Sequence, residues 1–209
     1  MSEKTEDIDK LSSSTPSVDK PIQATEKEES VWELVRFALI VLVLAVGLRF
    51  FVAQPFVVSG SSMVPTFTDK DYLIVDELTY DFENPARGDV IVFHPPAQPK
   101  GIYYIKRVIG LPGETISING GTVTIANADH PNGFVLSEPY ISAPTNNVIT
   151  KKLGSDEYFV MGDNRPFSSD SRSWGVLPRK NIVGRTFLRL LPVTHISVLP
   201  GAHNTYIAQ

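Results

Sequence analysis

The pattern of apolar and polar positions divides the chain into three parts. Residues 1–30 mix Ser, Thr, Pro and charged residues and contain almost no large apolar ones. Such a segment cannot bury enough surface to offset the entropy of ordering, so it is predicted to be disordered. An apolar run covers residues 37–48 and, after Arg49, resumes up to Ala53. Beyond it, short apolar runs alternate with turns, and residues 201–209 are interpreted as a C-terminal tail.

Residues 31–53 are interpreted as an uncleaved membrane anchor. The uninterrupted run at 37–48 is short for a membrane span and would also suit a signal-peptide core or a buried helix. However, the long side chain of Arg49 can reach the headgroups, which extends the usable length. A helix that is apolar on every face has no amphipathic role on a globular surface. Arg49 and two phenylalanines also occupy the place where a cleavable signal needs small residues.

Basic residues on either side of this run predict its orientation. Lys20, Lys27 and Arg36 lie on the N-terminal side, whereas Arg49 and Lys70 lie on the C-terminal side. Because positive residues favour the inner face, residues 1–30 are expected in the cytoplasm and the body outside. The predicted location is the cell (plasma or inner) membrane, crossed once.

The body at residues 54–200 is predicted to be mostly antiparallel β-structure. Residues 116–125 alternate around Asn119-Gly120, the strongest short-range signal for a hairpin. Polar, turn-rich residues follow up to 157, and together they predict a smaller outlying lobe at about 115–157. The other predicted strands are rich in β-branched and aromatic residues and cover 72–76, 90–94, 102–109, 158–161, 182–190 and 195–199.

Composition and charge exclude several kinds of function. The net charge of −4 arises in residues 1–30, which hold four Lys against eight Asp and Glu, so the rest of the chain is balanced. A neutral body lacks the basic footprint of a nucleic-acid-binding protein. The absence of Cys excludes a thiol nucleophile and a Cys-based zinc site. The four histidines show neither metal-ligand nor catalytic-triad spacing, so no metal is predicted; they are His94, His130, His195 and His203.

Three segments contain residues that could carry chemistry, and each also has a purely structural interpretation. Residues 59–67 (SGSSMVPTF) could form an active-site turn or a linker. On the strand predicted at 102–109, Lys106 shares a face with Tyr104 and Val108, where it is either a functional amine or reaches past them to water. Residues 161–175 (MGDNRPFSSDSRSWG) could form a functional loop or a surface loop that bonds to itself.

Together these segments resemble the type I signal peptidases, membrane-bound serine proteases with a Ser–Lys dyad. The S-M-x-P-T turn, the strand Y-Y-I-K-R-V-I-G-L-P-G-E and the loop G-D-N-R-x-x-S-x-D-S-R-x-W-G occur in the family's order, as does R-G-D-V-I-V-F at 87–93. The resemblance covers about residues 32–190. It implies a mainly β fold, a coiled antiparallel β-sheet catalytic body with a small β-rich lobe, after a single N-terminal transmembrane helix. It also implies a monomer bound to the lipid bilayer.

The resemblance assigns roles to individual residues. Ser62 matches the nucleophile and Lys106 the general base, while Ser168 matches the serine that orients the lysine amine. Asp170 and Arg172 match a pair that holds the loop, and its supporting turn matches Gly162, Asp163 and Asn164. In some members a serine two residues before the nucleophile donates to the oxyanion hole, but Gly60 stands here. The hole is therefore expected to use the Ser62 N–H and a second donor, with Ser61 as one candidate.

The chemistry of the dyad agrees with this assignment. A serine hydroxyl is a weak nucleophile that needs a neighbouring base. Lysine acts as that base only when neutral, so its pKa must fall from about 10.4 towards 7–8. Burial among apolar neighbours such as Tyr104 and Val108 can produce a shift of that size. The mechanism needs neither a metal nor a cofactor.

By the same resemblance, the substrates are secretory preproteins, cut after small residues in the Ala-x-Ala pattern of their signal peptides. Residues 102–106 would pair with the extended substrate as an added strand. Shallow apolar pockets would be lined by Phe56, Val58, Met63, Phe67, Tyr104 and Ile105.

Two alternatives compete with this interpretation. A self-cleaving repressor-type peptidase shares the fold and the dyad, but it needs a DNA-binding domain and an internal Ala-Gly site, and no Ala-Gly dipeptide occurs. A membrane-tethered β module could instead bind a partner with the same loops and cleave nothing. The joint presence of Ser62, Lys106 and Ser168 argues against this second alternative.

Overall fold

The computed structural model describes residues 31–51 and 53–202, and it leaves out the side chains at 45, 46, 48–51 and 53. The tail predicted at 1–30 and most of the one predicted at 201–209 lie outside the described residues. The chain divides into two compact units between Ile40 and Val41. The second unit contains every strand of the described residues.

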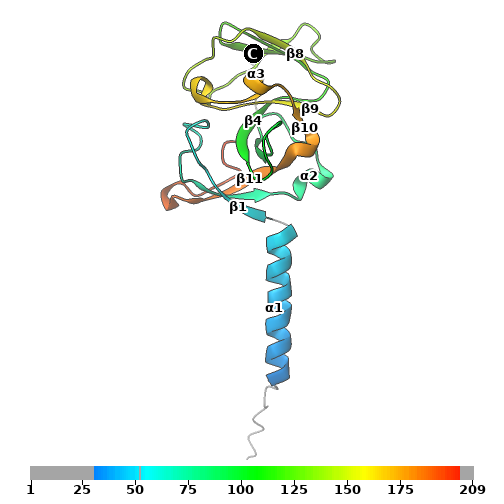
Figure 1. Cartoon of the computed structure of the whole chain (residues 1–209), viewed down its shortest axis with the longest axis vertical. Coiled ribbons are helices and arrows are strands. Elements are labelled where there is room, and N and C mark those ends of the chain that lie inside the picture. Colours follow the sequence, from blue (N-terminus) through cyan, green and yellow to red (C-terminus); the bar gives the residue numbers. More distant parts are fainter. Residues whose placement is uncertain (1–30, 52, 203–209) are drawn as a thin grey trace, which may run out of the picture. The chain divides into compact units, whose positions relative to one another are not determined.

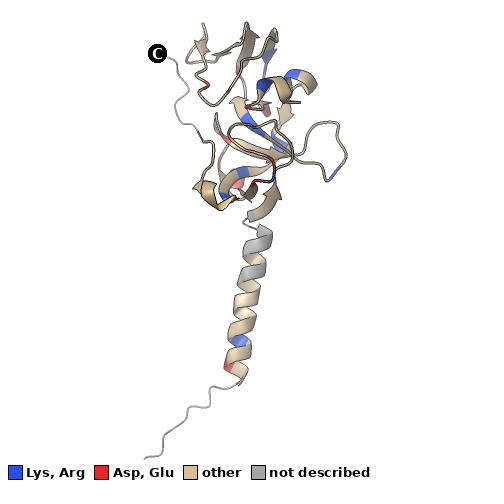
Figure 2. Ribbon diagram, turned by 90° about the vertical axis from the view of Figure 1, so that its left-hand side faces the viewer, with Lys and Arg blue, Asp and Glu red and all other residues tan. Residues whose placement is uncertain are grey.

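Helix α1 covers Val31–Phe51, where the sequence predicts the anchor. Its described charged side chains, Glu33 and Arg36, both lie in the first two turns, and Figure 2 shows uncharged residues along the described helix beyond them. A search of the described residues finds no helix with the length and apolarity that crossing a membrane requires.

A curled antiparallel sheet forms the main part of the second unit (Figure 1). Its strands follow the order β1-β2-β11-β3-β4-β9-β10, with β12 added beside β11. All its neighbouring strands run antiparallel. The strands are β1 (Ala53–Val57), β2 (Tyr72–Asp76), β3 (Val90–Phe93), β4 (Tyr104–Gly110), β9 (Glu157–Met161), β10 (Leu177–Pro178), β11 (Ile182–Leu191) and β12 (Ser197–Val198).

A second sheet has the strand order β7-β6-β5-β8 and includes the predicted hairpin. Its strands are β5 (Thr115–Asn119), β6 (Thr122–Ala126), β7 (Phe134–Val135) and β8 (Ile149–Lys152). Asn119 pairs with Thr122, so the two turn residues are Gly120 and Gly121. The turn therefore lies one position later than Asn119-Gly120. Both glycines have positive φ, 54° and 84°, as a tight turn of this type needs.

Short helical turns connect the strands, as expected for a body without helical periodicity. They are α2 (Thr79–Phe82), α3 (Ser171–Trp174) and the 3₁₀ turns η1 (Arg165–Phe167), η2 (Arg179–Asn181) and η3 (Val193–His195). Turn η3 shortens the last predicted strand, because His195 belongs to the turn and β12 keeps only Ser197–Val198.

Strand β1 was not predicted and it matters for the site. It contains Pro55, which cannot donate to a sheet ladder, and it lies at the edge of the sheet, where a proline is tolerated. Five residue pairs with β2 add strand β1 to the main sheet.

A small apolar core lies next to the turn between β1 and β2. It consists of Val58, Met63, Phe67, Leu73 and Val90, and each of these side chains is buried. Two further clusters fill the rest of the unit, one of them centred on the second sheet. The turn is therefore held in place by the packing of its own buried side chains, Val58, Met63 and Phe67.

Candidate active site

Ser62 lies in the tight turn between β1 and β2. Gly60 has φ of +96°, which a glycine adopts without strain, and its N–H donates to Asp69 Oδ1 at 2.9 Å. Two apolar residues of the turn point inward, because Met63 is 1 % exposed and Phe67 is fully buried. Ser62 itself remains partly exposed beside them. The turn thus presents one hydroxyl at the surface on a backbone that is held at both ends.

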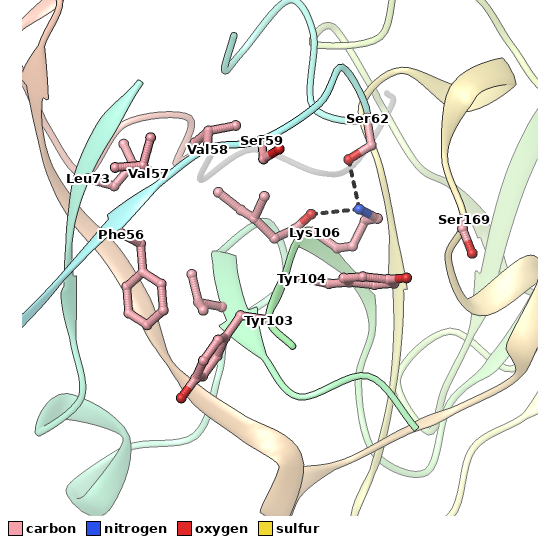
Figure 3. Close-up of a pocket in the computed structure, with 12 residues that line it drawn as sticks. Phe56, Val57, Val58, Ser59, Ser62, Leu73, Tyr103, Tyr104, Lys106 and Ser169 are labelled. Carbon is pink, nitrogen blue, oxygen red and sulfur yellow. Dashed lines mark hydrogen bonds between the residues drawn. The ribbon is translucent and has the colours of Figure 1, made fainter. Parts of the chain in front are cut away.

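Lys106 reaches this hydroxyl from the middle of the main sheet. It lies on β4, opposite Ile91 of β3, and its side chain is buried. Its Nζ donates to Ser62 Oγ at 2.8 Å and to the Ile105 carbonyl at 2.9 Å (Figure 3). The structure thus brings together two residues that lie 44 positions apart in the chain.

Burial lowers the pKa of Lys106 from 10.5 to about 8. Removal from water is the largest cause, and the positive charge of Arg172 acts in the same direction. The negative charges of Asp170 and Asp163 oppose it by raising the pKa. The Tyr104 ring lies with its centre 5.3 Å from Nζ, on the face where the sequence predicts it. A substantial fraction of the amine is therefore neutral near pH 8.

Buried ion pairs hold the loop at 162–172 against the dyad. Asp163 pairs with Arg107, and both side chains are fully buried. Arg107 follows Lys106 on β4, so the pair ties the loop to the strand that carries the base. Asp170 accepts from the Gly162 N–H at 3.0 Å and from Arg172 Nη2 at 2.7 Å. Asp170 and Arg172, which the sequence predicts to hold the loop, therefore lie in direct contact.

A third ion pair connects the loop to the segment that follows β7. Arg165 is buried and donates from both terminal guanidinium nitrogens, Nη1 and Nη2, to Glu138. Arg172 Nη1 also donates to Thr145 Oγ1 at 2.9 Å. Sequence reasoning missed Arg107, Arg165 and Glu138 as parts of this framework. In the sequence these charged residues cannot be told from exposed ones, because their partners lie far away along the chain.

At Gly162 the loop packs directly against Ser62 and Ser168. A Cβ at this position would lie 2.3 Å from Ser168 Oγ and 2.4 Å from the Ser62 carbonyl oxygen, so no larger residue fits. The Ser168 hydroxyl is buried and, within the described part of the chain, has no hydrogen-bond partner. The hydrogen bond expected between the Ser168 hydroxyl and the Lys106 amine is therefore not formed here. The loop at 162–172 nevertheless contacts the turn that carries Ser62, through the bond from the Asn164 N–H to the Ser62 carbonyl.

A pocket of about 250 Å³ lies next to the dyad and is mostly apolar. Four of the predicted binding residues line it, namely Phe56, Val58, Tyr104 and Ile105. Met63 and Phe67 do not, because both are packed in the core beneath the turn. The lining residues that the sequence did not indicate are Val57, Ser59, Leu73, Val92, Tyr103 and Ser169 (Figure 3). Leu73 and Val92 come from β2 and β3, whose place beside the site depends on long-range strand pairing.

Among the described residues, no group of three or more His, Asp or Glu side chains is placed to hold a metal ion.

Comparisons with known proteins identify relatives over most of the chain. The family model described as "Signal peptidase, peptidase S26" matches residues 31–191. The chain is 39 % identical over 192 residues to a signal peptidase I of Leptolyngbya laminosa, which covers 88 % of this chain and 92 % of that protein. It is 40 % identical over 176 residues to the probable signal peptidase I-1 of Synechocystis sp., covering 79 % and 87 %. A crystal structure of a signal peptidase I from Enterococcus faecalis V583 matches with 32 % identity and a TM-score of 0.42, over 49 % of this chain and 97 % of that one.

The match of the family model over 31–191 and these identities over most of both chains confirm the family indicated by the sequence motifs: the chain belongs to the signal peptidases of the peptidase S26 family, which are serine endopeptidases.

Proposed function

We propose that this protein is a membrane-bound endopeptidase that removes N-terminal signal peptides from exported preproteins, with Ser62 as nucleophile and neutral Lys106 as general base. The observation that carries the proposal is the 2.8 Å hydrogen bond between Ser62 Oγ and a buried lysine amine. A nucleophile within hydrogen-bond reach of a base whose pKa is lowered by burial is the arrangement that acyl transfer needs.

The reaction follows from this geometry. Ser62 Oγ attacks the scissile carbonyl carbon while its proton passes to Lys106 Nζ. The tetrahedral intermediate collapses as the C–N bond breaks, and Lys106 gives the proton to the leaving amine of the mature protein. The signal peptide stays attached to Ser62 as an ester. Neutral Lys106 then removes a proton from water, which attacks the ester. As the ester C–O bond breaks, Lys106 gives that proton to Ser62 Oγ, and the signal peptide leaves as a carboxylic acid that ionises.

The supporting residues act on the position of the dyad. Asp163 and Asp170 hold the loop through Arg107 and Arg172, and the small volume at Gly162 lets that loop approach Ser62. Ser168 would orient the lysine amine when its hydroxyl turns towards Nζ. The buried and unpaired state of that hydroxyl in the described structure leaves it available for such a bond.

Substrate preference is proposed to follow from the apolar pocket. Its small volume and its lining by Phe56, Val58 and Ile105 suit small apolar side chains, as in Ala-x-Ala sites. Residues 102–106, which include the first three residues of β4, would pair with the extended peptide and bring its carbonyl to Ser62. The substrates would be secretory preproteins, and the enzyme would act as a monomer without nucleic acid or cofactor.

Attachment to a lipid bilayer is proposed for residues 31–53. The support is the apolar run at 37–48 together with the exposure of its large side chains, such as Phe37, Leu39 and Leu42. With Lys20, Lys27 and Arg36 on its N-terminal side, the segment would cross the cell membrane once and place the catalytic body outside.

The test is cleavage of a preprotein with an Ala-x-Ala site by the full chain in detergent. We expect one cut after the second alanine, lost in Ser62→Ala and Lys106→Ala. Ser117→Ala and Lys180→Ala are matched controls, because the Ser117 hydroxyl bonds to Thr150 on the second sheet and Lys180 is exposed. Absence of cleavage by the folded wild type on several substrates would favour the tethered binding module instead. Cleavage that survives Ser62→Ala would show that the nucleophile is another residue.

A further inference from the structure

Asn164 bonds to two backbone carbonyls, one in the peptide unit before Ser62 and one in the peptide unit after it. Its side-chain Nδ2 donates to the Ser61 carbonyl at 3.0 Å, and its backbone N–H donates to the Ser62 carbonyl at 3.1 Å. Both acceptors are carbonyl oxygens, so only the amide nitrogen of the side chain can make the first bond. The 164 position thus connects the loop at 162–172 to two successive peptide units of the turn.

The bond from Asn164 Nδ2 is accepted by the peptide unit that contains the Ser62 N–H. The Ser61 carbonyl and the Ser62 N–H belong to the same planar amide, and they point in opposite directions. The Ser61 carbonyl also accepts the Val64 N–H at 3.2 Å. The Ser62 N–H makes no hydrogen bond to any other residue that the structure describes. One side of the amide is therefore held twice, and the other side remains free to donate.

We propose that the Asn164 side chain is a positioning residue of the oxyanion hole: it fixes and polarises the Ser61–Ser62 peptide, whose N–H stabilises the negative oxygen of the tetrahedral intermediate. This inference rests on the proposed function. A hydrogen bond accepted by an amide oxygen strengthens the donor at the other end of the same amide. It also holds the plane of the amide, and oxyanion stabilisation depends on donors that are aligned before the reaction begins.

The residue at position 60 increases the need for such support. Gly60 carries no side chain, so position 60 offers no hydroxyl to the oxyanion. More of the stabilisation then depends on the one backbone donor at Ser62. The bond from Asn164 acts through this donor and does not touch the substrate.

The experiment compares Asn164→Ala and Asn164→Asp with the wild type in detergent, on a preprotein with an Ala-x-Ala site. Asp keeps the shape of the side chain but replaces the donor by a negatively charged acceptor, so repulsion is added to the loss of the bond and kcat should fall further than in Asn164→Ala. Removing a direct oxyanion donor typically costs about 10²–10³ in kcat, so we expect about a tenfold fall for Asn164→Ala, which loses only the support of the donor. KM should stay within about twofold, because the bond acts on a donor that binds strongly only in the transition state.

Three readouts distinguish positioning from a general structural role. The pH at which kcat/KM reaches half its plateau should not move in Asn164→Ala, since Lys106 is untouched. A peptide aldehyde, which adds the Ser62 hydroxyl across its carbonyl to give a tetrahedral adduct, should lose affinity in proportion to kcat/KM. The corresponding peptide alcohol, which forms no such adduct, should bind equally well. Equal losses for aldehyde and alcohol, or a raised KM with unchanged kcat, would overturn the inference.

Asn181→Ala provides the matched control. Asn181 Nδ2 also donates to a backbone carbonyl, that of His94 at 2.9 Å, which follows the end of β3 and does not belong to the turn that carries Ser62. Its kcat should equal that of the wild type, and an equal loss there would attribute the effect to general loosening. Full activity of Asn164→Ala beside an active wild type would refute only the role of Asn164. An inactive folded wild type would refute the proposed function itself.

Discussion

Replacing the buried lysine by an apolar residue of similar length should make the fold more stable near neutral pH. The change is Lys106→Met, which removes the amine and retains most of the side-chain volume. In the wild type, the pKa of Lys106 falls from 10.5 to about 8 because the charged form is removed from water. A fall of about 2.5 units corresponds to about 3 kcal/mol against folding whenever the lysine is protonated in both states.

The size of the gain is reduced by the bonds that are lost. Nζ donates to Ser62 Oγ and to the Ile105 carbonyl, and each such bond contributes about 1 kcal/mol net. We therefore expect Lys106→Met to be more stable than the wild type by about 1–2 kcal/mol at pH 7.

The pH dependence has a definite sign. Because the pKa is lower in the folded state, the penalty is complete below pH 8 and fades as the pH rises towards 10.5. The advantage of Lys106→Met over the wild type should therefore shrink by about 1 kcal/mol between pH 7 and pH 9. Above pH 10 the wild type should be the more stable protein, since its hydrogen bonds then outweigh what remains of the penalty.

The assay is chemical denaturation of the full chain in one detergent, at pH 7, 9 and 10, with Lys180→Met as a reference for the loss of an exposed lysine. Lys106→Met must also be inactive at every pH. A variant that is less stable than the wild type by the same amount at pH 7 and pH 10 would refute the reasoning. That result would mean that the buried amine is solvated or paired in a way that offsets its burial.

Three further outcomes follow from the same contacts. The value of kcat/KM should rise with pH and level off above an apparent pKa of about 8, because only the neutral Lys106 accepts the Ser62 proton; a flat profile from pH 6 to 9 would contradict this. Gly162→Ala should lose at least about 100-fold in kcat, because its Cβ would lie 2.4 Å from the Ser62 carbonyl oxygen, whereas Gly47→Ala in helix α1, whose Cβ meets nothing within 4 Å, should cleave normally. Arg107→Met should cost about 3–5 kcal/mol of unfolding free energy by leaving Asp163 buried and unpaired, and adding Asp163→Asn should restore part of it, as measured by denaturation of both variants.

Local patterns in the sequence predicted most strands well, because a strand with one buried face repeats every two residues. The run at 72–76 is an example, since Leu73 and Val75 are buried while their neighbours are partly exposed. The second-sheet hairpin was also found, one position away from its true turn. What alternation could not reveal was strand order: β11 lies between β2 and β3, and this pairing joins residues that are about 90 to 120 positions apart.

The sequence motifs indicated the pair of residues that meet in the site, but only some of the residues that line the pocket beside it. Motif residues identified Ser62 and Lys106, and the structure places them within bonding distance. The pocket lining was harder to predict, because the turn at 59–68 has no periodicity that separates inward from outward residues. Met63 and Phe67 follow Ser62 closely in the sequence, yet both side chains point into the apolar core next to the turn and not into the pocket.

The buried charges around the dyad explain why so much of the framework was invisible in the sequence. Lys106 and Arg107 are adjacent, and both are almost fully buried, but on opposite faces of β4. Arg107 meets Asp163 and remains a paired cation, whereas Lys106 meets only neutral oxygens and is driven towards its neutral form. One strand thus holds the loop with a charged pair on one face and carries an amine of lowered pKa on the other. The same loop, through Asn164, bonds back to the Ser61 and Ser62 carbonyls, so strand, loop and nucleophile position one another.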